Sequence, residues 1–223
     1  MSTPVLINGA SGTGKSRSIV GLNPVETFII AALAKDLPFK GWRKKYIPLS
    51  KDGGNYLVTD DYTLINKTMD YVDKQRPEIK TLIIDDSQYL MANEFMRRHS
   101  TTGGGNAVFQ LYNEIGDHFW HLIMNARLLR QDLTVLFLHH SETSEAGNTK
   151  AKTIGKMLDD KVVIEGMFSI VLNTAMDNGK YFFETQNNGS NTTKSPEGMF
   201  DEKRIPNDLN FVVQSIHKYN TEG

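Results

Sequence analysis

Short apolar runs alternate along the chain with longer amphipathic stretches. The apolar runs are of strand length and are bounded by polar or breaker residues. Buried strands are predicted at 5–7, 27–32, 81–84 and 134–138. Helices with one apolar face are predicted at 61–74, 90–96, 108–130 and 208–219. This alternation predicts an α/β fold with a mainly parallel sheet and helices on its faces, because parallel strands need crossover connections.

The segments between these elements are polar and rich in residues that break regular structure. They cover 33–60, 100–106, 141–161 and 187–198. Near the C-terminus, the runs 168–175 and 180–185 flank Asp177-Asn178-Gly179, which favours a tight turn between antiparallel strands. No internal repeat and no long Pro/Ser linker interrupts the chain. We therefore predict one domain over residues 1–223, with a C-terminal antiparallel hairpin.

The composition narrows the class of protein. The chain has 223 residues, of which 39% are hydrophobic, and its 25 basic and 26 acidic residues leave a net charge of −1. Whole-chain charge gives no argument for nucleic-acid binding, so any basic surface must be local. The lack of cysteine excludes disulfides and thiolate metal sites. Since no signal peptide and no apolar stretch of about 18 residues is visible, we expect a cytoplasmic protein that contacts no membrane.

The first candidate site is a glycine-rich segment directly after the apolar run 5–7. Its pattern is G-x-x-x-x-G-K-S, formed by Gly9, Ala10, Ser11, Gly12, Thr13, Gly14, Lys15 and Ser16. In phosphate-binding loops the backbone N–H groups surround an anion, and a helix predicted to start near Gly14 adds its positive end. Lys15 is predicted to reach the β- and γ-phosphates of ATP, and the Ser16 hydroxyl to hold Mg²⁺. The alternative is a Gly/Ser-rich turn that matches by chance.

Two acidic residues follow the strand 81–84. Asp85 and Asp86 end an apolar run, and strand ends of this kind face the ligand crevice of α/β sheets. Asp85 is predicted to hold Mg²⁺ opposite Ser16, and Asp86 to orient or polarise the attacking water. The second strand runs out in Ala31-Ala32-Leu33-Ala34-Lys35 and offers no Glu for that role. Activation of the attacking water is therefore assigned to Asp86. The alternative is that both acids only cap the turn that leads into the next helix.

Two histidines follow the strand 134–138. A polar side chain at this strand end can contact the γ-phosphate and report its state to the loop beyond, which makes His140 a candidate catalytic residue. No further zinc ligands lie at a suitable spacing from His139 and His140. The alternative is a pair of strand-end histidines without a ligand.

The order of these motifs resembles the RecA-like ATPase core, and more narrowly the small phage recombination proteins of the RecA-like single-strand annealing family. The matching segments span most of the chain and lie at 9–16, 81–87, 135–140, 192–196 and 198–200. The resemblance implies an ATPase, stimulated by DNA, that binds single-stranded DNA and promotes annealing or strand exchange. It also implies the host bacterial cytoplasm as the location if the protein is phage-encoded.

The resemblance implies two DNA-binding loops, at 97–106 and 141–161. The candidate DNA contacts in them are Arg97, Arg98, Lys150, Lys152 and Lys156. Local basic loops can grip phosphates without sequence preference. Neither loop carries an aromatic residue that would stack on bases, which weakens the stacking part of this interpretation. The alternative is a pair of solvated surface loops.

The resemblance also implies assembly. In RecA-like filaments a lysine of one subunit completes the ATP site of its neighbour, and Lys194 stands at the matching place as a candidate catalytic residue. We therefore expect a homo-oligomer with ATP sites at subunit interfaces, and a single-strand-binding protein as a candidate partner. Only eight residues precede Gly9, so we expect no N-terminal polymerisation arm. A ring or a looser DNA-dependent assembly then fits as well as a filament.

Other functions stay open at the level of sequence. A nucleotide kinase fits the phosphate loop, although 141–161 has lysines and no arginine for a lid. A DNA-packaging or helicase-type motor also fits, although the chain is short and has no clear arginine finger. A nucleotide-gated binding module with little turnover is a further alternative. The aromatic and basic stretch 39–46 is either a partner surface or a loop pinned by its Trp.

Overall fold

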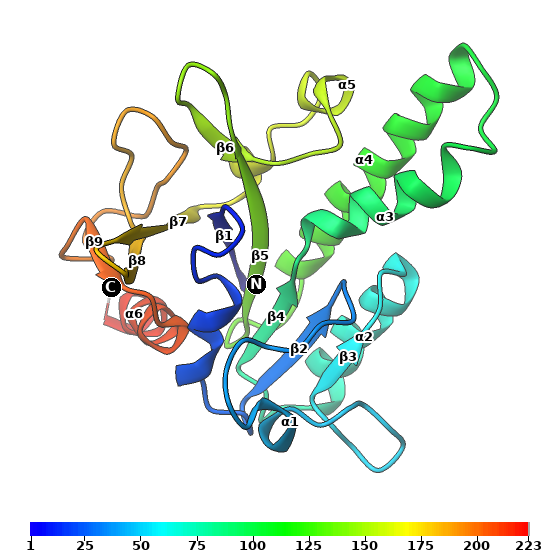
Figure 1. Ribbon diagram of the computed structural model, residues 1–223. Coiled ribbons are helices and arrows are strands. Elements are labelled where there is room, and N and C mark those ends of the chain that lie inside the picture. Colours follow the sequence, from blue (N-terminus) through cyan, green and yellow to red (C-terminus); the bar gives the residue numbers. More distant parts are fainter. Residues whose placement is uncertain (223) are drawn as a thin grey trace.

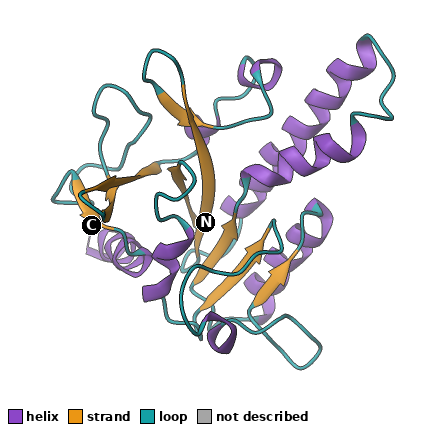
Figure 2. Ribbon diagram, in the orientation of Figure 1, coloured by secondary structure: helices purple, strands orange, loops and turns teal. Residues whose placement is uncertain are grey.

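A computed structural model of the protein describes residues 1–222. They form a nine-stranded sheet with helices on both faces (Figure 1, Figure 2). Eight strands follow the order β3-β2-β4-β5-β1-β7-β8-β9, and β6 pairs with β5 away from this path. The strands are β1 Thr3–Gly9, β2 Thr27–Ala31, β3 Tyr56–Val58, β4 Thr81–Asp85, β5 Thr134–Thr143, β6 Thr149–Ala151, β7 Ile170–Asp177, β8 Lys180–Glu184 and β9 Arg204–Pro206.

Pairing within the sheet is parallel from β3 across to β7 and antiparallel beyond it. β8 and β9 extend the sheet beside β7 as an antiparallel pair of strands. The tight turn between β7 and β8 uses Asn178 and Gly179, whose φ angles are +48° and +76°. Asparagine and glycine tolerate such angles best, so the turn forms where the sequence predicts it. The α/β fold with a C-terminal antiparallel hairpin is confirmed.

Residues 1–222 contain six α-helices and two short 3₁₀ helices, of which α6 follows the last strand. They are α1 Trp42–Lys45, α2 Tyr62–Gln75, α3 Gln88–Arg98, α4 Asn106–Arg127, α5 Lys156–Asp159, α6 Leu209–Glu222, η1 Ser16–Gly21 and η2 Ile164–Met167. Asp61 caps α2, because its carboxylate accepts the N–H groups of Thr63 and Leu64 at 2.7 and 3.1 Å.

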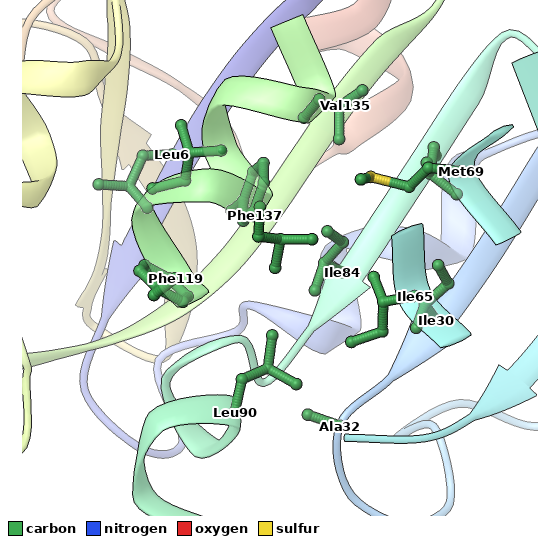
Figure 3. Packing of buried hydrophobic residues seen from close by; sticks show 14 of the residues in the cluster. Leu6, Ile30, Ala32, Ile65, Met69, Ile84, Leu90, Phe119, Val135 and Phe137 are labelled. Carbon is green, nitrogen blue, oxygen red and sulfur yellow. The ribbon is translucent and has the colours of Figure 1, made fainter. Parts of the chain in front are cut away.

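Alternation along the parallel strands builds one hydrophobic core on each face of the sheet. Leu6, Ile84 and Phe137 belong to the core covered by α2, α3 and α4 (Figure 3). Their chain neighbours, Ile83 among them, belong to the opposite core, which α6 and η1 cover. Burial of each large apolar side chain contributes about 1.5–3 kcal/mol. Two filled faces therefore hold the strand ends in fixed positions.

The strand register brings the sequence motifs to one edge of the sheet. Gly9, the last residue of β1, lies opposite His140 of β5. On the other side of β5, Ile84 pairs with Phe137, so that Asp85 follows at the same carboxyl edge. Since β5 runs between β1 and β4, the His140 end of β5 lies between the phosphate loop and the acid pair.

The first helix after the phosphate loop is shorter and tighter than predicted. The structure has a six-residue 3₁₀ helix at η1 instead of a helix from Gly14. At its end Gly21 packs against the Asp208 side chain so closely that a Cβ would lie 2.4 Å from Asp208 Oδ1. The residue before α6 thus packs directly on the end of η1. Because η1 is a helix of only six residues, its dipole contributes less at the phosphate loop than we expected.

Two polar segments are more ordered than their composition predicts. The segment 33–60 contains α1 and β3. The segment 141–161 contains β6 and α5, because β5 runs on to Thr143 and pairs with β6 antiparallel. These elements were missed because each is only three or four residues long, too short for a periodic apolar pattern, although Tyr56 and Leu158 reach the cores.

α3 and α4 form a helical arm that extends away from the sheet, joined at its tip by the glycine-rich segment 99–105 (Figure 1). α3 begins directly beyond Asp86 and Ser87, so the arm is rooted at the edge that carries the acid pair. Across residues 1–222, the helices are too short or too polar to span a membrane.

Candidate nucleotide-binding site

A cavity of about 490 Å³ opens at the carboxyl edge of the sheet, over the ends of β1 and β5. It gathers the predicted phosphate loop, Asp86 and His140, which come from segments far apart in the chain. Its lining comprises Ser11, Gly12, Gly14, Lys15, Ser16, Arg17, Lys35, Asp36, Pro38, Asp86, His140 and Tyr181. The sequence motifs therefore meet in one place, at the crevice that the strand-end rule predicts.

The phosphate loop needs glycine at two of its positions for different reasons. At Gly9 the backbone passes so close to β7 that a Cβ would lie 1.7 Å from Thr174 Oγ1. Gly14 has φ +98°, which side chains rarely adopt, and it packs against Tyr181 and Asn207. The Thr13 and Thr174 hydroxyls are 2.5 Å apart and fix the loop against β7.

Lys15 lies folded over the loop. Its Nζ donates to the carbonyls of Gly9 and Ala10 at 2.7 and 2.9 Å. Burial lowers the pKa of Lys15 to about 8, although the Asp86 and Asp85 carboxylates favour its charged form. A buried ammonium held only by neutral carbonyls is well placed to exchange them for phosphate oxygens.

Ser16 and Asp85 form the oxygen pair predicted to hold Mg²⁺. The Ser16 hydroxyl donates to Asp85 Oδ1 at 2.9 Å, which joins the phosphate loop to the end of β4. Burial raises the pKa of Asp85 to about 6, and the neighbouring Asp86 charge adds to the effect. A raised pKa means that the ionised Asp85 carboxylate is poorly stabilised in the protein alone. A hydroxyl oxygen and such a carboxylate are ligands that suit Mg²⁺. The residues present therefore fit the metal.

Asp86 is held on both oxygens. His140 Nε2 donates to Asp86 Oδ1 at 3.2 Å, and the Lys35 ammonium forms an ion pair with Oδ2. Burial alone would raise the pKa of Asp86, but the hydrogen bonds from His140 and Lys35 outweigh it and hold the pKa below its usual range. Asp86 also has φ +58°, a strained angle for a residue with a side chain. Such strain is typical of functional positions.

Sequence reasoning missed several residues that line this cavity. Lys35 could have been found, because it follows β2 at the same edge as Asp85 and the strand-end rule applies to it as well. Tyr181 of β8 carried no signal in the sequence. The Arg17 guanidinium lies 5.6 Å from the centre of the Tyr181 ring, and both side chains line the cavity. They offer a flat, cationic wall beside the phosphate loop.

His139 and His140 have different environments. His139 is fully buried, donates from Nε2 to the Lys152 carbonyl at 2.8 Å, and its Nδ1 lies 2.9 Å from Ser87 Oγ. Burial lowers the pKa of His139 to about 4, so it is neutral near pH 7. His140 faces the cavity and Asp86. Of the two histidines, His140 therefore belongs to the site and His139 supports it.

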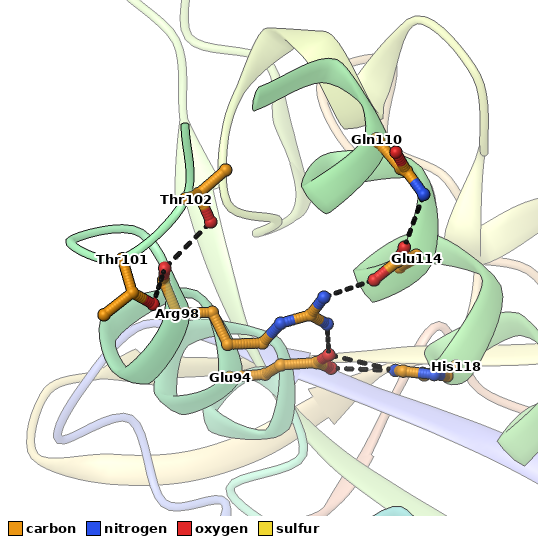
Figure 4. A network of polar contacts seen from close by, with 7 residues as sticks. All are labelled: Glu94, Arg98, Thr101, Thr102, Gln110, Glu114 and His118. Carbon is orange, nitrogen blue, oxygen red and sulfur yellow. Dashed lines mark hydrogen bonds and ion pairs between the residues drawn. The ribbon is translucent and has the colours of Figure 1, made fainter. Parts of the chain in front are cut away.

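The arginines predicted to bind DNA lie at the end of α3 and are paired with acids. Arg97 contacts Asp60 at 2.5 Å. Arg98 contacts Glu94 at 2.6 Å and also Glu114 of α4, in a network that His118 completes (Figure 4). This pairing leaves less positive charge for a polyanion than the sequence indicates.

The lysines predicted to bind DNA lie at and beyond β6. Lys150 is paired with Asp159 at 2.6 Å and with Glu142 at 3.3 Å. Lys152 and Lys156 are exposed, and neither forms an ion pair within residues 1–222. The second predicted loop thus offers more accessible positive charge than the first.

Lys194 is exposed and lies outside the cavity of its own chain. Its backbone pairs with Val171 of β7, at 2.8 and 2.9 Å in the two directions. Val171 pairs with Leu6 in the middle of β1, below the level of Gly9. A role at a neighbour's site stays a prediction.

Comparisons with known proteins agree with this geometry. The family model described as an AAA domain matches residues 2–196, which covers most of the 223-residue chain and includes the phosphate loop, the acid pair and both histidines. A search of curated proteins found no match. The chain belongs to the AAA domain family of P-loop ATPases, which use ATP with Mg²⁺.

Proposed function

We propose that this protein is an ATP-hydrolysing DNA-recombination protein that binds single-stranded DNA and promotes annealing or strand exchange. The observation that carries the proposal is a direct connection between the nucleotide cavity and an exposed basic segment. β5 passes the cavity at His140 and continues to Thr143 and the β5–β6 hairpin, which leads to Lys152 and Lys156.

Backbone and side-chain contacts make this connection short. The Lys152 N–H donates to the His140 carbonyl at 2.8 Å, and the Lys152 carbonyl accepts from His139 at 2.8 Å. His140 in turn donates to Asp86. A change at the γ-phosphate that moves His140 would therefore also move Lys152, because the two residues are directly hydrogen-bonded. This is the coupling that a DNA-dependent ATPase requires.

The charge on this segment suits a nucleic-acid backbone. Lys152 and Lys156 are exposed, and the segment carries no aromatic side chain. Accessible lysines bind phosphates without reading bases, so the affinity should depend strongly on salt. Because the net charge of the chain is only −1, the proposal of single-stranded DNA rests on these local lysines and not on overall charge.

Within the cavity, each group has a proposed part in hydrolysis. Lys15 binds the β- and γ-phosphates once it leaves the Gly9 and Ala10 carbonyls. Ser16 and Asp85 would hold Mg²⁺, which when bound neutralises charge on the phosphates. Asp86, kept ionised and positioned by His140, orients the attacking water and accepts its proton.

Assembly is the second part of the proposal. Lys194 is exposed and bridges to Val171 beside the start of β7, where a neighbouring subunit can reach it. A cation supplied to the γ-phosphate in trans would couple hydrolysis to oligomer formation. Lys194→Ala subunits, inactive alone, should regain hydrolysis when mixed with Lys15→Ala subunits. If the mixed subunits stay inactive, the hypothesis of an ATP site shared between subunits is wrong.

The test of the proposed function is ATP hydrolysis with and without single-stranded DNA at low and at high salt. We expect single strands to stimulate turnover at low salt, and the stimulation to disappear as salt rises. The double variant Lys152→Ala/Lys156→Ala should lose the stimulation and keep the basal rate. Lys67→Ala, an exposed lysine of α2, is the matched control. Phosphate transfer to a nucleoside without DNA binding would identify a kinase instead.

A further inference from the structure

Lys35 lies in the nucleotide cavity and has no part in the functions assigned so far. It follows β2, on a segment fixed to the end of β4 by the Ala32 N–H, which donates to the Asp85 carbonyl at 3.0 Å. Its ammonium pairs with Asp86 Oδ2, and both side chains line the cavity together with Lys15 and His140. The structure thus places a second lysine in the cavity, beside the carboxylate proposed to orient the attacking water.

The two partners of this ion pair differ in exposure. The Asp86 side chain is only 2% exposed, whereas the Lys35 side chain is 45% exposed. His140, the other partner of Asp86, is 18% exposed and packs edge-on against Tyr89 at 5.6 Å. Lys35 is therefore the partner that can move, because a long half-exposed side chain loses little packing when it swings.

The pairing also keeps water from Asp86. With His140 on Oδ1 and Lys35 on Oδ2, the carboxylate is almost fully covered. A carboxylate that orients an attacking water must be in hydrogen-bond reach of that water. In this arrangement Asp86 cannot perform its proposed part until Lys35 leaves. The triphosphate is the anion best able to draw it away, since it enters the same cavity with more negative charge than one carboxylate.

We propose that Lys35 is a charge switch for the triphosphate: it covers Asp86 in this structure, moves to the γ-phosphate when ATP binds, and thereby uncovers Asp86 for the attacking water. In the reaction the water oxygen bonds to the γ-phosphorus, and the bond from that phosphorus to the β–γ bridging oxygen breaks. The bridging oxygen leaves with the electron pair on ADP. The water proton passes to Asp86 and then to the released phosphate.

This inference rests on the ATPase part of the proposed function and not on DNA. Lys35 would supply a cation to the γ-phosphate from the same chain, in addition to the cation that Lys194 of a neighbouring subunit would supply. This role also accounts for a lysine at the end of β2, where we had looked for a glutamate. ADP has no γ-phosphate, so the switch predicts that Lys35 distinguishes ATP from ADP.

The first experiment compares nucleotide binding and hydrolysis by Lys35→Met, Lys35→Arg and the unchanged protein, without DNA. Lys35→Met should lose about tenfold in affinity for a non-hydrolysable ATP analogue and less than twofold for ADP. Its kcat should fall about 100-fold, as for the loss of one transition-state donor. Lys35→Arg should recover at least a tenth of the rate. Lys40→Ala, an exposed lysine on the same segment, is the control and should behave as the unchanged protein.

The second experiment tests the competition between Asp86 and the γ-phosphate. Asp86→Asn releases Lys35, so it should tighten binding of the ATP analogue several-fold although it impairs hydrolysis. In the Lys35→Met background the same substitution should tighten binding at least threefold less. Equal tightening in both backgrounds, or an unchanged ratio of ATP to ADP affinity in Lys35→Met, would overturn the switch. Loss of DNA stimulation alone would sink the recombination proposal and leave these results standing.

Discussion

The edge of the sheet and the helical arm both pair cations with acids, but the acids differ in their exposure to water. At the sheet edge Lys35 and His140 meet an Asp86 carboxylate that is 2% exposed. The Lys35 side chain itself is 45% exposed. On the arm, Arg98 is 39% exposed and contacts Glu94, which is 9% exposed, and Glu114, which is 38% exposed (Figure 4). Electrostatic interactions are strong where water is excluded and weak where it is not. The comparison therefore predicts that the sheet edge carries the catalytic chemistry and that the ion pairs of the arm contribute less.

The largest effect that this comparison predicts is at Lys15. Lys15→Ala should reduce kcat/KM for ATP hydrolysis by about 10²–10³-fold, because it removes a cation from developing phosphate charge. It should leave the melting temperature nearly unchanged, since burial lowers the pKa of Lys15 to about 8 and the fold gains little from its charge. Steady-state kinetics and thermal unfolding measure both, with Lys40→Ala as the control. If kcat/KM of Lys15→Ala stays within tenfold of the unchanged protein, the sheet edge does not carry the chemistry that the comparison predicts.

The next effect is steric and lies at the root of the phosphate loop. Gly9→Ala places a Cβ 1.7 Å from Thr174 Oγ1 and 2.7 Å from Thr13 Oγ1. Overpacking of this kind costs about 1–3 kcal/mol, which chemical denaturation would measure as a fall in the free energy of unfolding. Thr174→Ala should recover part of the loss in the double variant. Full stability of Gly9→Ala would mean that β1 and β7 are not held as closely as the structure places them.

Burial at the sheet edge should also appear in the pH dependence of stability. The pKa of His139 is about 4 in the folded protein and about 6.5 when unfolded, so the unfolded state binds more protons between these values. Stability from neutral His139 is thus complete above pH 6.5 and is lost as the pH falls towards 4. Denaturation at pH 7.5 and pH 5 should differ by about 2 kcal/mol more than in His139→Asn. Equal pH dependence of the two proteins would contradict this.

Sequence reasoning worked where a contiguous pattern or a strand end determines position. The phosphate loop is eight adjacent residues, and Asp85, Asp86 and His140 follow from the rule that ligands lie beyond the carboxyl ends of parallel strands. The same rule applied to β2 indicates Lys35, which we missed because we expected an acid there. In these cases the backbone alone fixes where the side chain goes.

The missed contacts depend on pairing between distant segments. Thr13 meets Thr174 only because β1 and β7 are neighbours in a parallel register, across 161 positions of the chain. On the arm, the Arg98–Glu94 pair has a helical spacing and was open to prediction, whereas Glu114 depends on how α4 packs on α3. The charge that the two arginines offer to DNA was therefore overestimated from sequence.

The smallest predicted effect is on the arm and makes the comparison sharper. Arg98→Ala should lower the melting temperature by less than about 3 °C, because exposed ion pairs contribute little. It should also leave the salt dependence of single-strand binding almost unchanged, since its charge is already paired with Glu94 and Glu114. The double variant Lys152→Ala/Lys156→Ala should reduce the slope of log affinity against log salt by about one per lost phosphate contact. A larger loss of slope in Arg98→Ala than in the lysine variant would assign DNA binding to the arm, because paired arginines can exchange carboxylates for phosphates.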